Sequence, residues 1–162
     1  MNTIYTIREI ENKDNEAIAK IIRQGLMDFD AVKPGTVYYD DTTDNLYEVF
    51  RKEKSTYFIL LIDGEIVGGG GVYPTEGLEE NTCELVKLYL KANFRGKGYG
   101  KILMNHCVEK AMALKYQYMY LESMPELNIA IPLYEKYGFG YLKAPMGNSK
   151  HTSCDIWMLK KL

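Results

Sequence analysis

Along this 162-residue chain, the spacing of apolar residues changes from segment to segment. Some segments have the spacing of a β-strand and others that of an α-helix. Short runs of alternating or continuous apolar residues, bounded by turn residues, are typical of β-strands. Asp63-Gly64 predicts a hairpin turn between two of these runs. Strands are expected over residues 3–10, 56–62, 65–73, 82–90 and 116–123, followed by two closing strands, the last of which includes residues 155–159.

Apolar residues spaced three and four apart predict helices between the strands. Helices are expected after a cap at Asn12 or Asp14, over residues 46–50, from Lys101 to Leu114 and from Asn128. Helices interleaved with strands predict an α/β fold, in which a mixed sheet carries helices on both faces.

A glycine-rich turn, residues 95–100 (RGKGYG), joins the strand that ends at Leu90 to the following helix. Backbone N–H groups at the start of a helix have no intrahelical partner, and the helix dipole favours negative charge there. Arg95, Lys97 and Lys101 add positive charge. The turn therefore predicts a pyrophosphate site, although the glycines would also suit a plain connection between a strand and a helix.

The glycine spacing narrows the choice of ligand. A mononucleotide P-loop ends in Gly-Lys followed by Ser or Thr, and no such hydroxyl residue follows Gly100. A dinucleotide-binding turn has the spacing G-x-G-x-x-G, whereas this turn has G-x-G-x-G. The segment resembles instead the acetyl-CoA signature of the GNAT superfamily of N-acetyltransferases, whose basic residue and two later glycines correspond to Arg95, Gly98 and Gly100.

Three further segments carry the resemblance. Residues 128–139 (NIAIPLYEKYGF) are similar to the superfamily segment that holds an Asn, an Ala, a Leu-Tyr pair and a Gly-Phe pair. Residues 83–90 and 116–123 resemble its fourth and fifth strands. The resemblance implies one GNAT-like domain over residues 1–162. Its central sheet would be mixed and mostly antiparallel, with about six or seven strands, a splay between the fourth and fifth strands and about four flanking helices.

The resemblance implies acetyl-CoA as co-substrate and no metal. The pantetheine arm would lie beside the fourth strand like an added strand and hydrogen-bond to its backbone. The cofactor-binding residues that the resemblance implies are Leu88, Tyr89, Leu90, Arg95, Gly96, Lys97, Gly98, Tyr99, Gly100, Lys101, Asn128 and Tyr134.

The same resemblance implies two catalytic residues. Tyr134 would donate a proton to the departing thiolate of CoA, and the alternative is that its ring only packs on the sheet. Glu84 would be the general base, because an amine with an ordinary pKa near 10.4 arrives mainly as ammonium; the alternative is a plain polar residue on a strand. His151 lies in a loop that would border the acceptor site, but a role in structure alone is favoured.

Two other features have more than one interpretation. Gly68 to Gly71 resemble a second phosphate loop, but they sit inside a predicted strand, where glycine marks a bulge or a close approach of backbone. We favour the strand. The acidic residues between Met27 and Glu48 are expected to form a solvated face, with attraction of a cationic amine as the alternative.

Composition excludes several other classes. The net charge of −2 argues against a nucleic-acid partner. The chain has no run of about 20 apolar residues, so no membrane span is expected. The first residues lack the features of a signal peptide. The three cysteines have no metal-binding spacing, so a cytoplasmic protein with reduced thiols is expected. A homodimer is left open.

The function implied is direct transfer of an acetyl group from acetyl-CoA to a primary amine of a small molecule or a protein. The alternative is a non-catalytic acyl-CoA-binding or regulatory module on the same fold. Such a module would keep residues 95–101 and lose the acid and the base.

Overall fold

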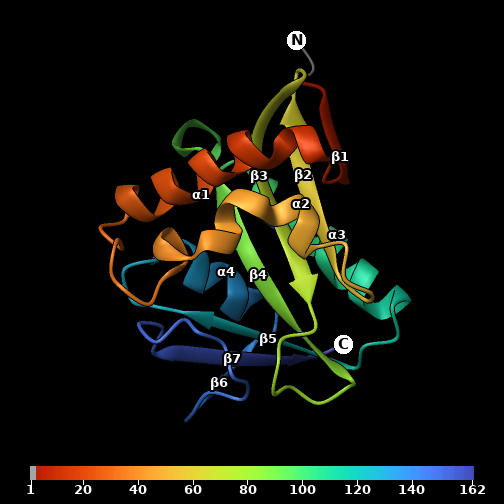
Figure 1. Cartoon of the computed structure of the whole chain (residues 1–162), viewed down its shortest axis with the longest axis vertical. Coiled ribbons are helices and arrows are strands. Elements are labelled where there is room, and N and C mark those ends of the chain that lie inside the picture. Colours follow the sequence, from red (N-terminus) through yellow and green to blue (C-terminus); the bar gives the residue numbers. More distant parts are fainter. Residues whose placement is uncertain (1–2) are drawn as a thin grey trace.

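In a computed structural model of the chain, which describes residues 3–162, seven strands form one sheet (Figure 1). The spatial order is β1-β2-β3-β4-β5-β7-β6. Neighbouring strands run antiparallel except β4 and β5, which are parallel. The strands are β1 (Tyr5–Glu9), β2 (Thr56–Ile62), β3 (Glu65–Tyr73), β4 (Thr82–Leu90), β5 (Tyr118–Ser123), β6 (Gly140–Leu142) and β7 (Ile156–Lys161).

Helices cover both faces of this sheet. Residues of α1 pack with β2 in one buried cluster, whereas residues of α3 and α4 pack with β5 in another. Figure 1 shows α1 and α2 in front of the sheet and α3 behind it. The helices within the described chain are α1 (Asn15–Asp28), α2 (Leu46–Val49), α3 (Tyr99–Ala113) and α4 (Ala130–Lys136). The predicted mixed, mostly antiparallel sheet with flanking helices is confirmed.

Several predicted helix boundaries were wrong by a few residues. The helix after the glycine-rich turn begins at Tyr99 rather than Lys101, because Gly98 already serves as its N-cap. The last helix begins at Ala130, so Asn128 lies in the preceding turn. Asp14 gives no side-chain cap to α1. Its buried carboxylate accepts instead from Arg8 at 2.7 Å and from the backbone N–H of Glu11.

The sheet is splayed, as predicted, between β4 and β5. The two strands pair only from Thr82 opposite Tyr118 to Glu84 opposite Tyr120. Beyond Glu84 they diverge (Figure 1), and β5 continues to pair with β7 on its other side. The separation opens the sheet along the second half of β4.

The glycine run is part of a strand, as favoured from the sequence. Gly68 to Gly71 lie within β3 and are buried between β2 and β4. Side chains are excluded there because a Cβ atom at Gly68 would lie 2.5 Å from the carbonyl oxygen of Tyr89, and one at Gly71 would lie 2.6 Å from that of Thr56. Close approach of neighbouring backbone therefore explains the glycines, and the second phosphate loop does not exist.

Across residues 3–162, none of the helices combines the length and the apolar character that a bilayer crossing requires.

Candidate active site

The predicted pyrophosphate turn follows β4 and leads directly into α3. Gly96 and Gly98 adopt the left-handed conformation, with φ of 73° and 89°, which glycine enters without steric cost. A Cβ atom at either position would meet no heavy atom within 4 Å, so the space beside the turn is open. Gly98 supplies no side-chain cap, and the first N–H groups of α3 can therefore bind an anion.

The three cations predicted at this turn have different surroundings. Arg95 donates to the carboxylate of Asp28 at 3.0 Å and to the carbonyl oxygen of Leu90 at 3.1 Å. Its side chain therefore joins the end of α1 to the end of β4. Lys97 and Lys101 are exposed and have no ion-pair partner among residues 3–162. These two lysines are the cations free to meet a phosphate.

A cavity of about 270 Å³ extends from the turn into the gap between β4 and β5. Lys97, Tyr99 and Asn128 lie outside its lining. Asn128 is exposed, and the ring of Tyr99 packs against Phe94. The predicted cofactor-binding residues that do line the cavity are Leu88, Tyr89, Leu90, Arg95, Gly96, Gly98, Gly100, Lys101 and Tyr134. The cavity thus joins the anion site to the splayed part of the sheet.

Tyr134, the predicted general acid, lies in α4 and lines this cavity. Its side chain is 8% exposed, and its ring packs edge-on against Phe139 at a centroid distance of 5.9 Å. Burial raises the pKa of the Tyr134 hydroxyl above its ordinary value. The hydroxyl therefore keeps its proton at neutral pH, which a proton donor requires.

A β-bulge interrupts β4 beside the cavity. Gly69 pairs with Tyr89 and Gly71 with Val86, so the register shifts between them. Lys87 takes a left-handed backbone conformation there, with φ of 51°. A bulge disrupts the hydrogen-bond ladder locally and leaves backbone groups unpaired, and this bulge lies next to Leu88, one of the predicted cofactor-binding residues.

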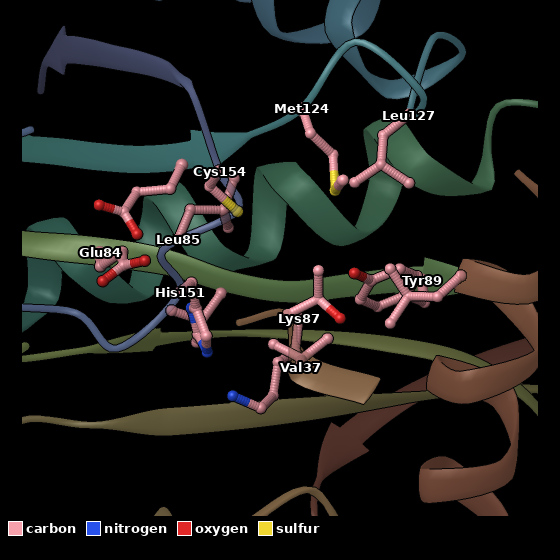
Figure 2. Close-up of a pocket in the computed structure, with 13 residues that line it drawn as sticks. Val37, Glu84, Leu85, Lys87, Tyr89, Met124, Leu127, His151 and Cys154 are labelled. Carbon is pink, nitrogen blue, oxygen red and sulfur yellow. The ribbon is translucent and has the colours of Figure 1, made fainter. Parts of the chain in front are cut away.

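A second cavity, of about 50 Å³, lies against β4 (Figure 2). Glu84 and Lys87 of β4 line it together with His151 and Cys154 from the loop before β7. The two cavities are neighbours, because they share the lining residues Leu85, Lys87, Tyr89, Glu122 and Leu127.

Glu84, the predicted base, is 4% exposed and faces this smaller cavity. Thr75 donates a hydrogen bond to its carboxylate at 2.6 Å. Burial raises the pKa of Glu84 to about 7, and the nearby carboxylate of Glu122 adds to the shift. A carboxylate with a pKa near neutrality is suited to accept a proton and release it again.

His151 has a larger part in the site than the sequence indicated. Its Nε2 lies 3.4 Å from a carboxylate oxygen of Asp40, and the imidazole lines the cavity beside Glu84. The hydrogen bond with His151 holds the pKa of Asp40 well below its usual range. Glu122 and Lys87 also line this cavity. Neither could be predicted as a site residue, because neither belongs to a local motif.

One set of side chains in the pocket has the donor atoms of a cation site. Ligand atoms of Glu84, Glu122 and His151 lie within 4.8 Å of one another. Carboxylate oxygen and imidazole nitrogen are ligands for divalent cations, and the same carboxylates would attract an ammonium group. The absence of a metal from the reaction therefore stays a prediction.

The acidic residues between Met27 and Glu48 are mostly exposed, as the favoured solvated face requires. Asp28 pairs with Arg95, and Asp44 pairs with Arg23 at 2.6 Å. Asp40 meets His151. Three of these acids therefore also join elements around the site.

The sequence matches the model of the acetyltransferase (GNAT) family over residues 13–139. The uncharacterized N-acetyltransferase YjgM of Escherichia coli (strain K12) is 36% identical over 157 residues, which cover 96% of this chain and 94% of that protein. The N-acetylaspartate synthetase of Rattus norvegicus is 34% identical over 113 residues, which cover 70% of this chain but only 36% of the synthetase.

Solved structures share the fold at much lower sequence identity. A GNAT-family acetyltransferase of Staphylococcus aureus Mu50 superposes with a TM-score of 0.85 at 17% identity, over 98% of this chain and 99% of that chain. The PaiA N-acetyltransferase of Thermoplasma acidophilum, solved in complex with coenzyme A, superposes with a TM-score of 0.77 at 18% identity, over 98% and 99% of the two chains.

Three observations indicate the same kind of protein. The turn before α3 is open to an anion, a cavity runs along β4 where the sheet is splayed, and the family model matches most of the chain. The family uses acetyl-CoA and passes its acyl group to an acceptor substrate. The chain belongs to the GNAT family of acetyltransferases and is an acyltransferase.

Proposed function

We propose that this protein transfers an acetyl group from acetyl-CoA directly to the primary amine of a small molecule, with both substrates bound at once. The observation that carries the proposal is the shared wall of the two cavities, to which Lys87 and Tyr89 contribute. A thioester in the larger cavity and an amine in the smaller one would meet across this wall. Holding both reactants in line supplies much of the acceleration.

In the proposed reaction, Glu84 takes a proton from the substrate ammonium, and the free amine attacks the thioester carbonyl carbon. A backbone N–H at the bulge near Leu88 stabilises the oxyanion that forms. The carbon–sulfur bond then breaks, the acetyl group stays on nitrogen, and Tyr134 donates a proton to the CoA thiolate. Tyr134 and Glu84 line different cavities, which suits a proton acceptor on the amine side and a proton donor on the thiol side.

Direct transfer is favoured over an acyl-enzyme because the thiol at the site is poorly activated. Cys154 lines the smaller cavity, but burial raises its pKa to about 12, and the carboxylates of Glu122 and Glu84 add to the shift. A thiol rather than a thiolate is a weak nucleophile. We call the smaller cavity, in which the amine would bind, the acceptor cavity. Its small size favours a small amine, and the relatives named N-acetylaspartate synthetase are named for a small N-acetylated product.

The experiment is thiol release from acetyl-CoA in the presence of a panel of small primary amines. Amine-dependent release, with intersecting double-reciprocal lines and a Cys154→Ser variant that keeps its activity, is the expected result. Parallel lines, together with an acetylated Cys154 after incubation with acetyl-CoA alone, would overturn direct transfer. If acetyl-CoA stabilised the protein against thermal unfolding but no amine caused thiol release, the non-catalytic module would be favoured. NAD and ATP serve as controls for nucleotide binding in the thermal unfolding experiment.

A further inference from the structure

The side chain of Lys87 lines the acceptor cavity at the point where β4 is bulged. In a regular strand, side chains alternate between faces, and Lys87 would share the face of Leu85, which packs in the core beneath α3. The bulge breaks that alternation. Val86 packs in the cluster on the α1 side, and Lys87 lines the cavity that also contains Glu84.

The backbone at this position is strained. Left-handed φ is sterically unfavourable for an L-residue, and Lys87 adopts it with φ of 51°. Strain of this kind persists where the surrounding structure holds it, and such residues cluster at functional sites. A hydrogen bond of 2.7 Å from the hydroxyl of Tyr57 to the carbonyl oxygen of Lys87 holds it here.

The acids near the ammonium group of Lys87 already have other hydrogen-bond donors. Thr75 donates to Glu84, and Tyr120 and Ser149 donate to Glu122. Asp40 accepts from Thr42 and lies beside His151.

Within residues 3–162, by contrast, the Lys87 ammonium has no ion pair within 4.0 Å and no hydrogen bond. Burial lowers the pKa of Lys87, against the opposing effect of Asp40 and Glu84. The pocket is therefore lined by a partly buried cation that pairs with none of the carboxylates of residues 3–162; Figure 2 shows Lys87 among the side chains that line it.

We infer that Lys87 binds a carboxylate of the acceptor, so that the acceptor is a small zwitterion of the amino-acid class. The inference rests on the proposed function and names its substrate class. The ammonium end of such a molecule would face Glu84 and Glu122, and its carboxylate would pair with the ammonium group of Lys87. A purely cationic amine would leave Lys87 unpaired and add a second positive charge beside it. The cavity of about 50 Å³ limits the acceptor to a small molecule.

The test compares amino acids with their own amides and with the amines that lack the carboxyl group. For the parent protein, kcat/KM for the acid should exceed that for the amide by about ten- to a hundredfold, as expected for a hydrogen bond between charged groups. Lys87→Met should bring this ratio close to one. The ratio is taken within each variant, so a general loss of activity cancels. Lys20→Met, which removes an exposed lysine paired with Glu16 on α1, should keep the parental ratio.

A second measurement needs no turnover. N-acetylated amino acids carry the carboxylate without the amine, and their binding in the presence of CoA should be weakened about tenfold or more by Lys87→Met, whereas the N-acetylated amides should bind weakly to both proteins. Transfer to amides as fast as to acids would overturn the inference and leave the proposed function intact. Binding that depends on Lys87, without transfer to any amine, would support the inference and overturn the proposed function.

Discussion

The hydroxyl of Tyr57 on β2 donates a hydrogen bond to the backbone carbonyl of Lys87 on β4, although β3 lies between these two strands. The glycines of β3 leave the space through which the Tyr57 side chain reaches β4. A Cβ atom at Gly69 would lie 2.6 Å from the Tyr57 ring, and one at Gly71 would lie 2.7 Å from it. The ring therefore crosses a strand that has no side chains there and fixes the bulge from behind. Tyr57 is a positioning residue, since it acts on the site only through Lys87.

Replacing Tyr57 with Phe should lower kcat about tenfold with little change in the KM for acetyl-CoA, because the bulge loses its support while the pyrophosphate turn is untouched. The free energy of unfolding should fall by about 1 kcal/mol, as for an ordinary buried hydrogen bond. Steady-state kinetics and thermal unfolding measure the two effects.

Tyr116→Phe is the matched control for that variant. Tyr116 is also buried, its hydroxyl donates to the carbonyl oxygen of Lys54 at 2.8 Å, and it lines neither cavity. It should show a similar loss of stability with kcat unchanged. If both variants kept the parental kcat, the bond from Tyr57 would be structural only.

Tyr134→Phe should reduce kcat by about ten- to a hundredfold, with little change in acetyl-CoA affinity, because the hydroxyl acts only as the thiolate departs. Pre-steady-state thiol release and equilibrium binding of acetyl-CoA measure the two quantities. Tyr137→Phe, which changes a tyrosine just after α4 that bonds to Asn105, serves as the control. A kcat equal to that of the parent would mean that Tyr134 only packs against the sheet and donates no proton.

Glu84→Gln should change the pH–rate profile as well as the rate. With a pKa of about 7, Glu84 is a free base above neutrality and is protonated below it, so the parental rate should fall as the pH drops through about 7. The variant depends on amine that is already neutral in solution. The ratio of parental to variant rate should therefore be largest at about pH 7 and below, and it should shrink as the pH rises toward the pKa of the acceptor amine. A constant ratio of the two rates across the whole pH range would mean that Glu84 is not the general base.

The raised pKa of Glu84 also affects stability: as the pH rises, the rate should increase, whereas the contribution of Glu84 to the stability of the fold should decrease. Because the folded-state pKa of Glu84 is raised from 4.5 to about 7, its contribution is fully present below pH 4.5 and is lost as the pH rises through 7. The Gln variant has no such loss. Relative to the parent, its melting temperature should therefore increase between pH 4.5 and pH 7, and a constant difference would contradict the burial argument.

Gly98→Asp should weaken acetyl-CoA binding by tenfold or more, because a carboxylate would occupy the anion site at the start of α3. Gly98→Asn is the matched control, since Asn and Asp both tolerate the left-handed conformation and the position has open space around it. Isothermal titration with acetyl-CoA should rank the parent first, Asn next and Asp last. Equal affinities for the Asp and Asn variants would mean that the turn does not hold a phosphate.

The features that local sequence determines were the predictable ones. Alternation located the strands, and the glycines at 96 and 98 marked a turn whose backbone requires them. Glu84 and Tyr134 were identified through resemblance, and both line cavities. The contact between Asp40 and His151 could not be predicted, because it joins residues 111 positions apart. The bulge at Lys87 also escaped prediction, since it depends on how β3 and β4 pair rather than on either strand alone.

The glycine run of β3 also limits how this protein can be made more resistant to heat. Exchanging glycine for alanine commonly stabilises a fold by about 0.4–1 kcal/mol, because the unfolded chain loses freedom. At Gly68, Gly69 and Gly71 the added methyl group would press against a carbonyl oxygen of an adjacent strand, 2.5 to 2.7 Å away. A library of variants screened for activity would therefore mark these positions as intolerant for a purely steric reason, and stabilising substitutions are better sought outside the sheet.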